Sequence, residues 1–235
     1  MSATSTISHE IADSLRDEIL TQRYRAGERL PSERDLASRF DASRGAVREA
    51  LSQLEQLGLI RIYPGGARIQ AIDAASIAIL GPLMAAGEFP DLVLEDQFLQ
   101  TFGALSALTI GSAIEKANNE QMQRLSEIVE DMSGHSKDFE SMQPHWQELH
   151  EYLATIADNL VVQLISNDLK AQFVEQMMKL GIKPVMNQAQ LKQLLHSLRT
   201  CIADRDAELA AAMMQAHFDD FRVAVSEAIC LKQAV

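Results

Sequence analysis

The sequence predicts a mainly α-helical protein in two parts: a small N-terminal domain with three helices and one β-hairpin, and a larger all-helical bundle. Three observations lead to this prediction. Apolar residues recur at helical spacing along most of the 235-residue chain, and the alternation typical of strands is confined to a short stretch ending near residue 72. Residues 1–72 hold ten arginines, no lysine and ten acidic residues, whereas residues 73–235 account for the whole net charge of −12. We therefore expect domains at 1–72 and 73–235.

The first helix is indicated by "ISHEIADSLRDEIL", in which four apolar residues lie on one helical stripe: Ile7, Ile11, Leu15 and Ile19. The following "YRAGERLPSE" contains Gly27 and Pro31 and is typical of a turn. The second helix is expected to begin after Ser32, with Asp35 in the capping-box position.

The third helix is predicted from Ser43 as the N-cap and Gly58 as the C-terminal stop signal. Its core-facing positions are Val47, Ala50, Leu51, Leu54 and Leu57. Only the short "DAS" separates it from the second helix.

Two short strands are predicted next, Leu59–Tyr63 and Ala67–Ile72, around Pro64, Gly65 and Gly66. Three helices with a tight turn between the second and third, followed by a hairpin, predict a winged helix-turn-helix.

Arg44 and Arg48 are one helical turn apart at the start of the third helix. The helix dipole already places partial positive charge there, so two arginines at this end need a reason. A DNA-reading helix contacts the major groove with its N-terminal residues, and the planar guanidinium suits both phosphates and guanine edges. The pair therefore predicts a DNA-binding surface.

The run "RLPSERDLASRFDASRGAVREALSQLEQLGLI", followed by "YPGGARI", resembles the DNA-binding domain of GntR-superfamily transcription regulators, closest to the FadR-like branch. The resemblance implies DNA contacts from Arg34, Ser43, Arg44, Arg48, Gly65 and Gly66. It leaves Glu33 and Glu49 to orient arginines or face solvent, and Arg68 either to contact phosphate or to be a solvated strand residue. It also implies a homodimeric, cytoplasmic, effector-controlled regulator that binds double-stranded operator DNA, and we expect a repressor.

The second half is expected to be helical throughout, with helices near 74–85, 91–115, 119–133, 138–157, 160–180, 188–204 and 206–231. Residues 98–114 carry no charge over nearly five turns, which predicts a helix buried all round in the centre of a bundle. Four small residues on it would allow close helix packing: Gly103, Ala104, Ala107 and Gly111.

FadR-like regulators carry a C-terminal effector-binding bundle of this length, and many bind a metal there through an Asp and three His. Aligned without gaps, those positions hold Trp146, His150, Leu195 and His217, with His196 one residue away. Phe102 and Ser106 stand where relatives often place a charged anchor for carboxylate ligands. The resemblance therefore implies an effector pocket at Phe102, Ser106, Trp146, His150, His196 and His217, and an effector with substantial apolar surface.

The histidines leave three interpretations open. In one, His145 and His196 face solvent while His150 and His217 are satisfied core residues. In another, His150, His196 and His217 hold a divalent metal such as zinc or nickel with rearranged ligands. In the third, the imidazoles bond the effector directly. No cofactor is certain.

Other functions are less consistent with the sequence. It has no P-loop, no G-x-G-x-x-G after a strand, no G-x-S-x-G and no H-E-x-x-H, so we expect no enzyme. A DNA-binding architectural protein without an effector is the remaining alternative. The N-terminus does not resemble a signal peptide, no stretch predicts a membrane span, and Cys201 and Cys230 lie in helical patterns typical of structural thiols.

Overall fold

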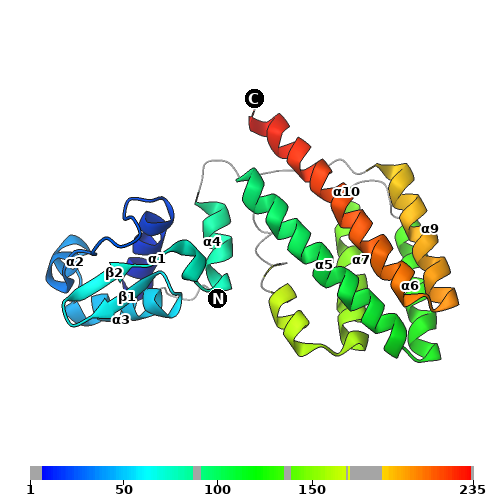
Figure 1. Cartoon of the computed structure of the whole chain (residues 1–235), viewed down its shortest axis with the longest axis horizontal. Coiled ribbons are helices and arrows are strands. Elements are labelled where there is room, and N and C mark those ends of the chain that lie inside the picture. Colours follow the sequence, from blue (N-terminus) through cyan, green and yellow to red (C-terminus); the bar gives the residue numbers. More distant parts are fainter. Residues whose placement is uncertain (1–6, 87–90, 135–138, 168, 170–186, 234–235) are drawn as a thin grey trace. The chain divides into compact units, whose positions relative to one another are not determined.

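The computed structural model describes residues 7–86, 91–134, 139–167, 169 and 187–233 (Figure 1). The chain divides into two compact units, Met1–Glu88 and Phe89–Val235. The described part is mainly helical with one two-stranded sheet, as predicted.

The first unit is a winged helix-turn-helix. Three helices, α1 (Ile7–Leu20), α2 (Glu33–Arg39) and α3 (Arg44–Gln56), precede the antiparallel strands β1 (Ile60–Tyr63) and β2 (Gly66–Ile69). β1 begins one residue later than predicted. β2 begins one residue earlier and ends three residues earlier than predicted, because residues 72–74 form a 3-10 helix, η1. The apolar stripe of α1 is buried from Ile11 onward, whereas Ile7 at the start of the helix is 46% exposed.

Serine caps define the two helices of the helix-turn-helix. The Ser32 hydroxyl accepts a hydrogen bond from the Asp35 backbone N–H at 3.2 Å and donates to its carboxylate at 2.6 Å. The Ser43 hydroxyl accepts from the Ala46 N–H at 3.1 Å, so α3 begins at Arg44 as predicted. Each cap satisfies a backbone donor that the first helical turn cannot.

A partly buried ion pair joins α1 to α2. Arg39 donates through Nη1 to the Glu18 carboxylate at 2.9 Å, and through Nη2 to the other carboxylate oxygen. Glu18 is 9% exposed, and the Arg39 hydrogen bond and charge hold the pKa of its carboxyl below the ordinary value. This pair and the shared core fix α2 against α1.

The first unit extends beyond the boundary predicted at residue 72. A second 3-10 helix, η2 (Ile77–Ile79), leads into α4 (Leu80–Ala85), and the Ser76 N–H donates to the Leu57 carbonyl at 2.9 Å. Ile79 is 5% exposed within the core of this unit. The single helix predicted over 74–85 is therefore an N-terminal-unit segment with two 3-10 turns before its α-helical part.

The second unit is an all-α bundle, as predicted. Its helices are α5 (Leu92–Lys116), α6 (Asn119–Gly134), α7 (Phe139–Ala157), α9 (Gln188–Asp204) and α10 (Ala207–Gln233). Residues 160–167 are also helical, and the rest of the helix predicted to reach residue 180 lies outside the described residues, apart from helical residue 169. The core combines residues from all five helices, including Ile110, Leu125, Leu149, Leu195 and Phe218. Within the described ranges, no helix is long and apolar enough to cross a membrane.

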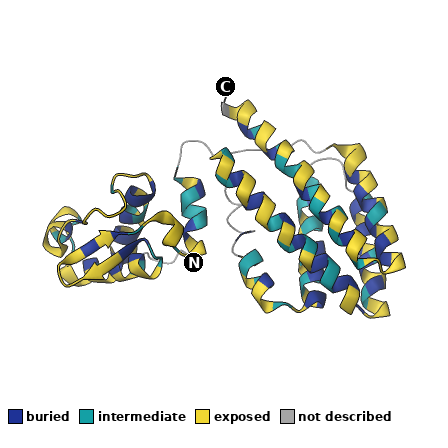
Figure 2. Cartoon of the chain, viewed as in Figure 1, coloured by how far each residue is buried: buried dark blue, intermediate teal, exposed yellow. Residues whose placement is uncertain are grey.

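The uncharged stretch 98–114 of α5 is not buried all round. It packs along α10, but Thr101, Ala104 and Leu108 are exposed on its other side, and Leu108 is 54% exposed (Figure 2). The close helix packing expected at the small residues of this stretch is found at Gly103. A Cβ added there would lie 2.7 Å from the Phe218 Cβ on α10. Part of the uncharged stretch thus forms an exposed stripe that the described residues leave uncovered.

Candidate nucleic-acid interface and effector cavity

The exposed start of α3 carries the predicted DNA-reading arginines. Arg44 and Arg48 are both exposed one turn apart, directly behind the Ser43 cap. The Arg48 side chain is 73% exposed, and its Nε lies 3.9 Å from the Glu33 carboxylate on α2. Glu33 is thus within ion-pair distance of this arginine, but both side chains are exposed and the pair is weak. An exposed, lightly tethered guanidinium can reach a base edge or phosphate.

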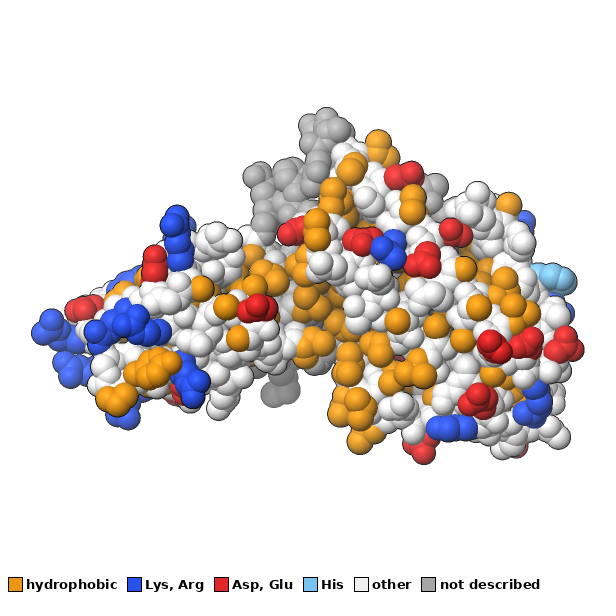
Figure 3. All heavy atoms as spheres, in the orientation of Figure 1, with side chains coloured by type: hydrophobic (Ala, Val, Ile, Leu, Met, Phe, Trp, Pro, Cys, Tyr) orange, Lys and Arg blue, Asp and Glu red, His pale blue; other side chains and the backbone are white. Residues whose placement is uncertain are grey.

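Arg34 lies on the same helix-turn-helix. Its side chain is 76% exposed, and its Nε is 3.7 Å from the carboxylate of its neighbour Asp35. The Ser32 hydroxyl bonds Asp35 and lowers the pKa of its carboxyl, so this acid is ionised at neutral pH. Basic side chains are spread over the face of this unit seen in Figure 3, although residues 1–72 hold as many acidic residues as arginines.

The wing contains an arginine that the sequence did not single out. Residues 28–30 pair with β2, because the Leu30 N–H donates to the Ala67 carbonyl at 3.0 Å and the Ile69 N–H to the Glu28 carbonyl at 2.9 Å. This pairing brings the Arg29 guanidinium onto the wing tip. No local pattern signals it, because 36 residues separate Arg29 from Gly65.

The Arg29 guanidinium lies against the wing where Gly65 and Gly66 have no side chain. A Cβ on Gly65 would lie 3.1 Å from Arg29 Nη2, and one on Gly66 would lie 2.9 Å from Arg29 Nε. Gly66 also has φ +123°, a backbone conformation that favours glycine. Arg68 on β2 donates to the Gly27 carbonyl at 3.0 Å, so its guanidinium supports the loop before the wing.

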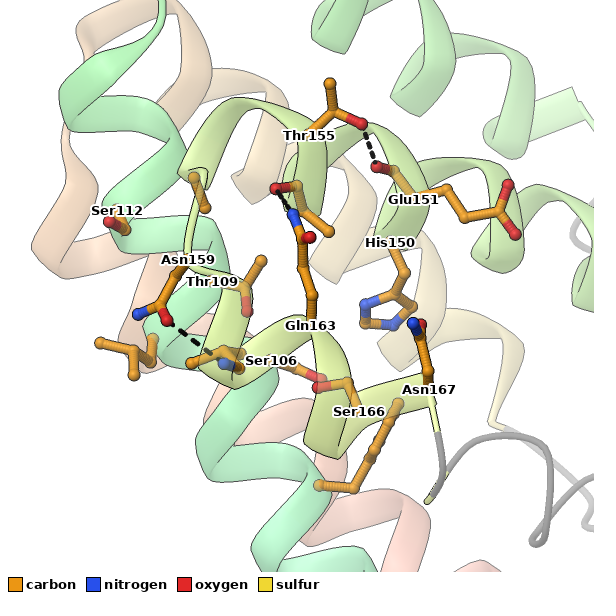
Figure 4. Close-up of a pocket in the computed structure, with 15 residues that line it drawn as sticks. Ser106, Thr109, Ser112, His150, Glu151, Thr155, Asn159, Gln163, Ser166 and Asn167 are labelled. Carbon is orange, nitrogen blue, oxygen red and sulfur yellow. Dashed lines mark hydrogen bonds between the residues drawn. The ribbon is translucent and has the colours of Figure 1, made fainter.

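The second unit contains a cavity of about 280 Å3 between α5, α7 and residues 159–167, which we call the α5–α7 cavity (Figure 4). Of the predicted pocket residues, Phe102, Ser106 and His150 line it. Ten of its fifteen lining residues have polar side chains: Ser106, Thr109, Ser112, His150, Glu151, Thr155, Asn159, Gln163, Ser166 and Asn167. The other five are apolar: Phe102, Leu108, Ala154, Ala157 and Val162. The effector with substantial apolar surface expected from the sequence stays a prediction, to which this lining adds a need for several polar groups.

Trp146 and His217 form an aromatic stack beside this cavity without lining it. Their rings are 4.8 Å apart and inclined by 15°, and the Trp146 ring is 5.9 Å from the His150 ring. Burial lowers the pKa of His217 to about 4, so its imidazole is neutral at pH 7. His217 instead lines a second cavity of about 480 Å3 between α9 and α10.

The other two histidines lie apart from this stack. His196 is exposed on α9, so it does not join the pocket predicted for it. His145 lies 3.2 Å from the Asp131 carboxylate with its side chain 20% exposed, so it does not simply face solvent.

These residues do not fit a metal ion. The described residues contain no group of three or more His, Cys, Asp or Glu side chains arranged to hold one. The indole of Trp146, which offers no lone pair in its ring plane, lies against the His217 imidazole. Phe102 lies 5.7 Å from His150 on the other side. Aromatic rings thus pack around the imidazoles of His150 and His217, where further metal ligands would have to lie.

Comparison with known families gives two matches. Residues 7–68 match the model described as bacterial regulatory proteins, gntR family, and residues 97–220 match the FCD domain. The first match covers the helix-turn-helix and wing, and the second covers most of the bundle, including the α5–α7 cavity.

Similar proteins are known by sequence and by structure. The HTH-type transcriptional repressor NanR of Enterobacter sp. (strain 638) is 30% identical over 167 residues, which are 69% of this chain and 63% of that protein. The HTH-type transcriptional regulator YcbG of Bacillus subtilis (strain 168) is 30% identical over 164 residues, 67% of this chain and 65% of that protein. The matches thus span less than two thirds of these relatives.

A solved structure of Lar, described as controlling the expression of the Listeria monocytogenes agr system, shares the fold. It has a TM-score of 0.56 and 17% identity, over 96% of this chain and 99% of that one. The matching families and relatives are transcription regulators rather than enzymes, as the sequence predicted.

Proposed function

The chain belongs to the GntR family of bacterial regulatory proteins and carries an FCD domain, and from this premise we propose that it is a sequence-specific DNA-binding transcription repressor controlled by a small-molecule effector. The similar protein from Enterobacter is named a repressor, which supports repression rather than activation. The FCD match supports effector binding in the second unit.

The observation that carries the proposal is the start of α3. Ser43 caps the helix, and Arg44 and Arg48 stand exposed behind it, where a recognition helix meets the major groove. Arg34 on α2 and the wing glycines Gly65 and Gly66 complete the proposed contact surface. These groups bind phosphates and base edges without needing a basic protein overall.

We propose a homodimer. One helix-turn-helix contacts a half-site of a few base pairs, which is too short for specific binding, and two-fold operators match two-fold proteins. The exposed uncharged stripe of α5, with Thr101, Ala104 and Leu108, supports association because a surface that stays in water normally carries charge. A second copy would cover it.

We propose that the effector binds in the α5–α7 cavity. A ligand shifts the protein between DNA-binding arrangements only through its difference in affinity for them, and operator DNA changes effector affinity by the same factor. The cavity and the FCD match disfavour an architectural protein without effector.

Selection of binding sites from a pool of randomised duplex DNA tests the proposal. The wild-type chain is expected to enrich one two-fold symmetric site, and sedimentation of the complex is expected to give two chains per duplex. A pool that stays random after repeated rounds, with a protein folded by circular dichroism, would contradict sequence-specific binding.

A further inference from the structure

We propose that the α5–α7 cavity binds an uncharged, hydroxyl-rich molecule of about monosaccharide size, and this inference rests on the proposed function in treating that cavity as the effector site. A cavity of about 280 Å3 is at the small end of the roughly 300–1,000 Å3 typical of ligand sites. The groups that face it set the ligand chemistry.

Ser106 is the central polar group. It is 5% exposed, it lines the cavity from α5, and its hydroxyl makes no hydrogen bond among the described residues. Since this hydroxyl faces the cavity, its hydrogen-bonding capacity is open to water or to a bound ligand. Because a serine hydroxyl both donates and accepts, it matches a ligand hydroxyl.

Two carboxamides add one acceptor and one donor. Gln163 donates through Nε2 to the Ala154 carbonyl at 2.7 Å, which fixes the amide and leaves its oxygen for a ligand (Figure 4). Asn159 accepts through Oδ1 from the Val162 N–H at 3.2 Å, which leaves its NH2 group. A polyol can bond both, since each of its hydroxyls is donor and acceptor.

The charged groups nearby are directed elsewhere. The Lys116 amine, one turn beyond Ser112 on α5, donates to the Ala157 carbonyl at the end of α7. The Glu151 carboxylate accepts from the Gln147 amide at 2.7 Å and points away from Ser106 and Gln163 in Figure 4. The described lining residues include no lysine or arginine that could pair with a ligand carboxylate, so desolvating such a carboxylate in this cavity would be unfavourable.

Phe102 gives the cavity one apolar wall. Its ring is held by an edge contact with Phe218 at 5.4 Å and lies 5.7 Å from the His150 ring. The C–H face of a sugar ring can pack on such an aromatic surface while its hydroxyls meet the serine and amide groups. One apolar face and several hydroxyls are thus the ligand features that the lining matches.

Matched neutral and acidic ligands test the inference. The full-length protein is titrated with glucose against glucuronate, galactose against galacturonate, and with ribose, mannitol and myo-inositol. Binding is followed by thermal shift and by emission of Trp146, the one tryptophan of the chain, whose ring lies 5.9 Å from that of His150. We expect at least one neutral compound to raise the melting temperature, and its acid, where one is tested, to bind at least tenfold more weakly.

Ser106→Ala is expected to weaken that binding about tenfold. Ser126→Ala is the matched control, because the Ser126 hydroxyl donates to the Met122 carbonyl of its own helix and does not line the cavity. Tighter binding of the acids, or no response to any neutral compound in the set, would overturn the inference. Intact DNA-site selection in the same preparation would then show that the ligand class failed and the proposed function did not.

Discussion

At the scale of single residues, Glu95 is a buried acidic side chain in the bundle whose burial is energetically unfavourable when it is ionised. It is 2% exposed on α5, and neither carboxylate oxygen has a hydrogen-bond partner among the residues that the structure describes. Burial, with a smaller contribution from Asp91, raises the pKa of its carboxyl to about 7. The folded state therefore holds a proton that the unfolded state releases near pH 4.5.

This proton makes stability depend on pH in a defined direction. The contribution of Glu95 is fully present below pH 4.5 and is lost as the pH rises to about 7. Glu95→Gln is expected to raise the free energy of unfolding at pH 8 by about 2–3 kcal/mol, since one pKa unit is about 1.4 kcal/mol, and by much less at pH 5. Urea unfolding at both pH values measures it.

Glu120→Gln is the control for this measurement, because Glu120 is exposed in the first turn of α6. The lowered pKa of His217 has the opposite effect, removing stability as the pH falls from 6.5 toward 4. This contribution of His217 is the same in the wild type and in the Glu95 variant, so it cancels when their free energies of unfolding are subtracted. An equal gain at both pH values would show that Glu95 is not the group that titrates.

At the scale of elements, the contact of α5 with α10 depends on two glycines in different ways. A Cβ on Gly103 would lie 2.7 Å from the Phe218 Cβ, which cannot move without its backbone. A Cβ on Gly111 would make ordinary contacts at 3.5 Å with the Ala207 carbonyl oxygen and the Ala211 Cβ. Replacing glycine by alanine should therefore lower the free energy of unfolding at position 103 and leave it unchanged or raise it at position 111.

Gly103→Ala is expected to lower the free energy of unfolding by about 1–3 kcal/mol through overpacking. Gly111→Ala is expected to leave it unchanged or raise it by up to about 1 kcal/mol, because alanine is the better helix former. Denaturant unfolding of both variants tests the pair. A stable Gly103→Ala variant would mean that α5 and α10 are farther apart than described here.

The elements differ in how far the sequence could predict them. Ser32, Ser43 and the apolar periodicity were sufficient for α2 and α3, because caps and helical faces are local features. The segment after residue 72 was assigned to the wrong unit, because the burial of Ile79 depends on a distant core. Arg29 and the exposed side of α5 were missed for the same reason, since pairing and coverage arise only on folding.

The candidate sites show the same division. Arg34, Arg44 and Arg48 are exposed where the motif put them, and Phe102, Ser106 and His150 meet at one cavity. His196 lies elsewhere, and the polar groups contributed by residues 159–167 were not foreseen. Their spacing carries no motif, and only the packing of this segment beside α5 brings them to Ser106.

At the scale of the whole molecule, DNA binding has to overcome a net charge of −12. The first 72 residues are neutral overall, so attraction to DNA depends on a local surface of exposed arginines. Contacts with phosphate release counterions, and each lost contact reduces the salt dependence of binding. The proposal that this protein binds DNA through α3 therefore depends on individual arginines, Arg44 and Arg48 above all.

The affinity of the selected DNA duplex for single-arginine variants, measured by fluorescence anisotropy at fixed salt, is the most direct test. Arg44→Ala and Arg48→Ala are each expected to lose about 1–3 kcal/mol of binding free energy. Arg16→Ala, whose guanidinium is paired with Asp13 and Asp17 on α1, is expected to bind like wild type. Wild-type affinity in both α3 variants, with their fold intact by circular dichroism, would contradict the assignment of this protein as a regulator that reads DNA with α3.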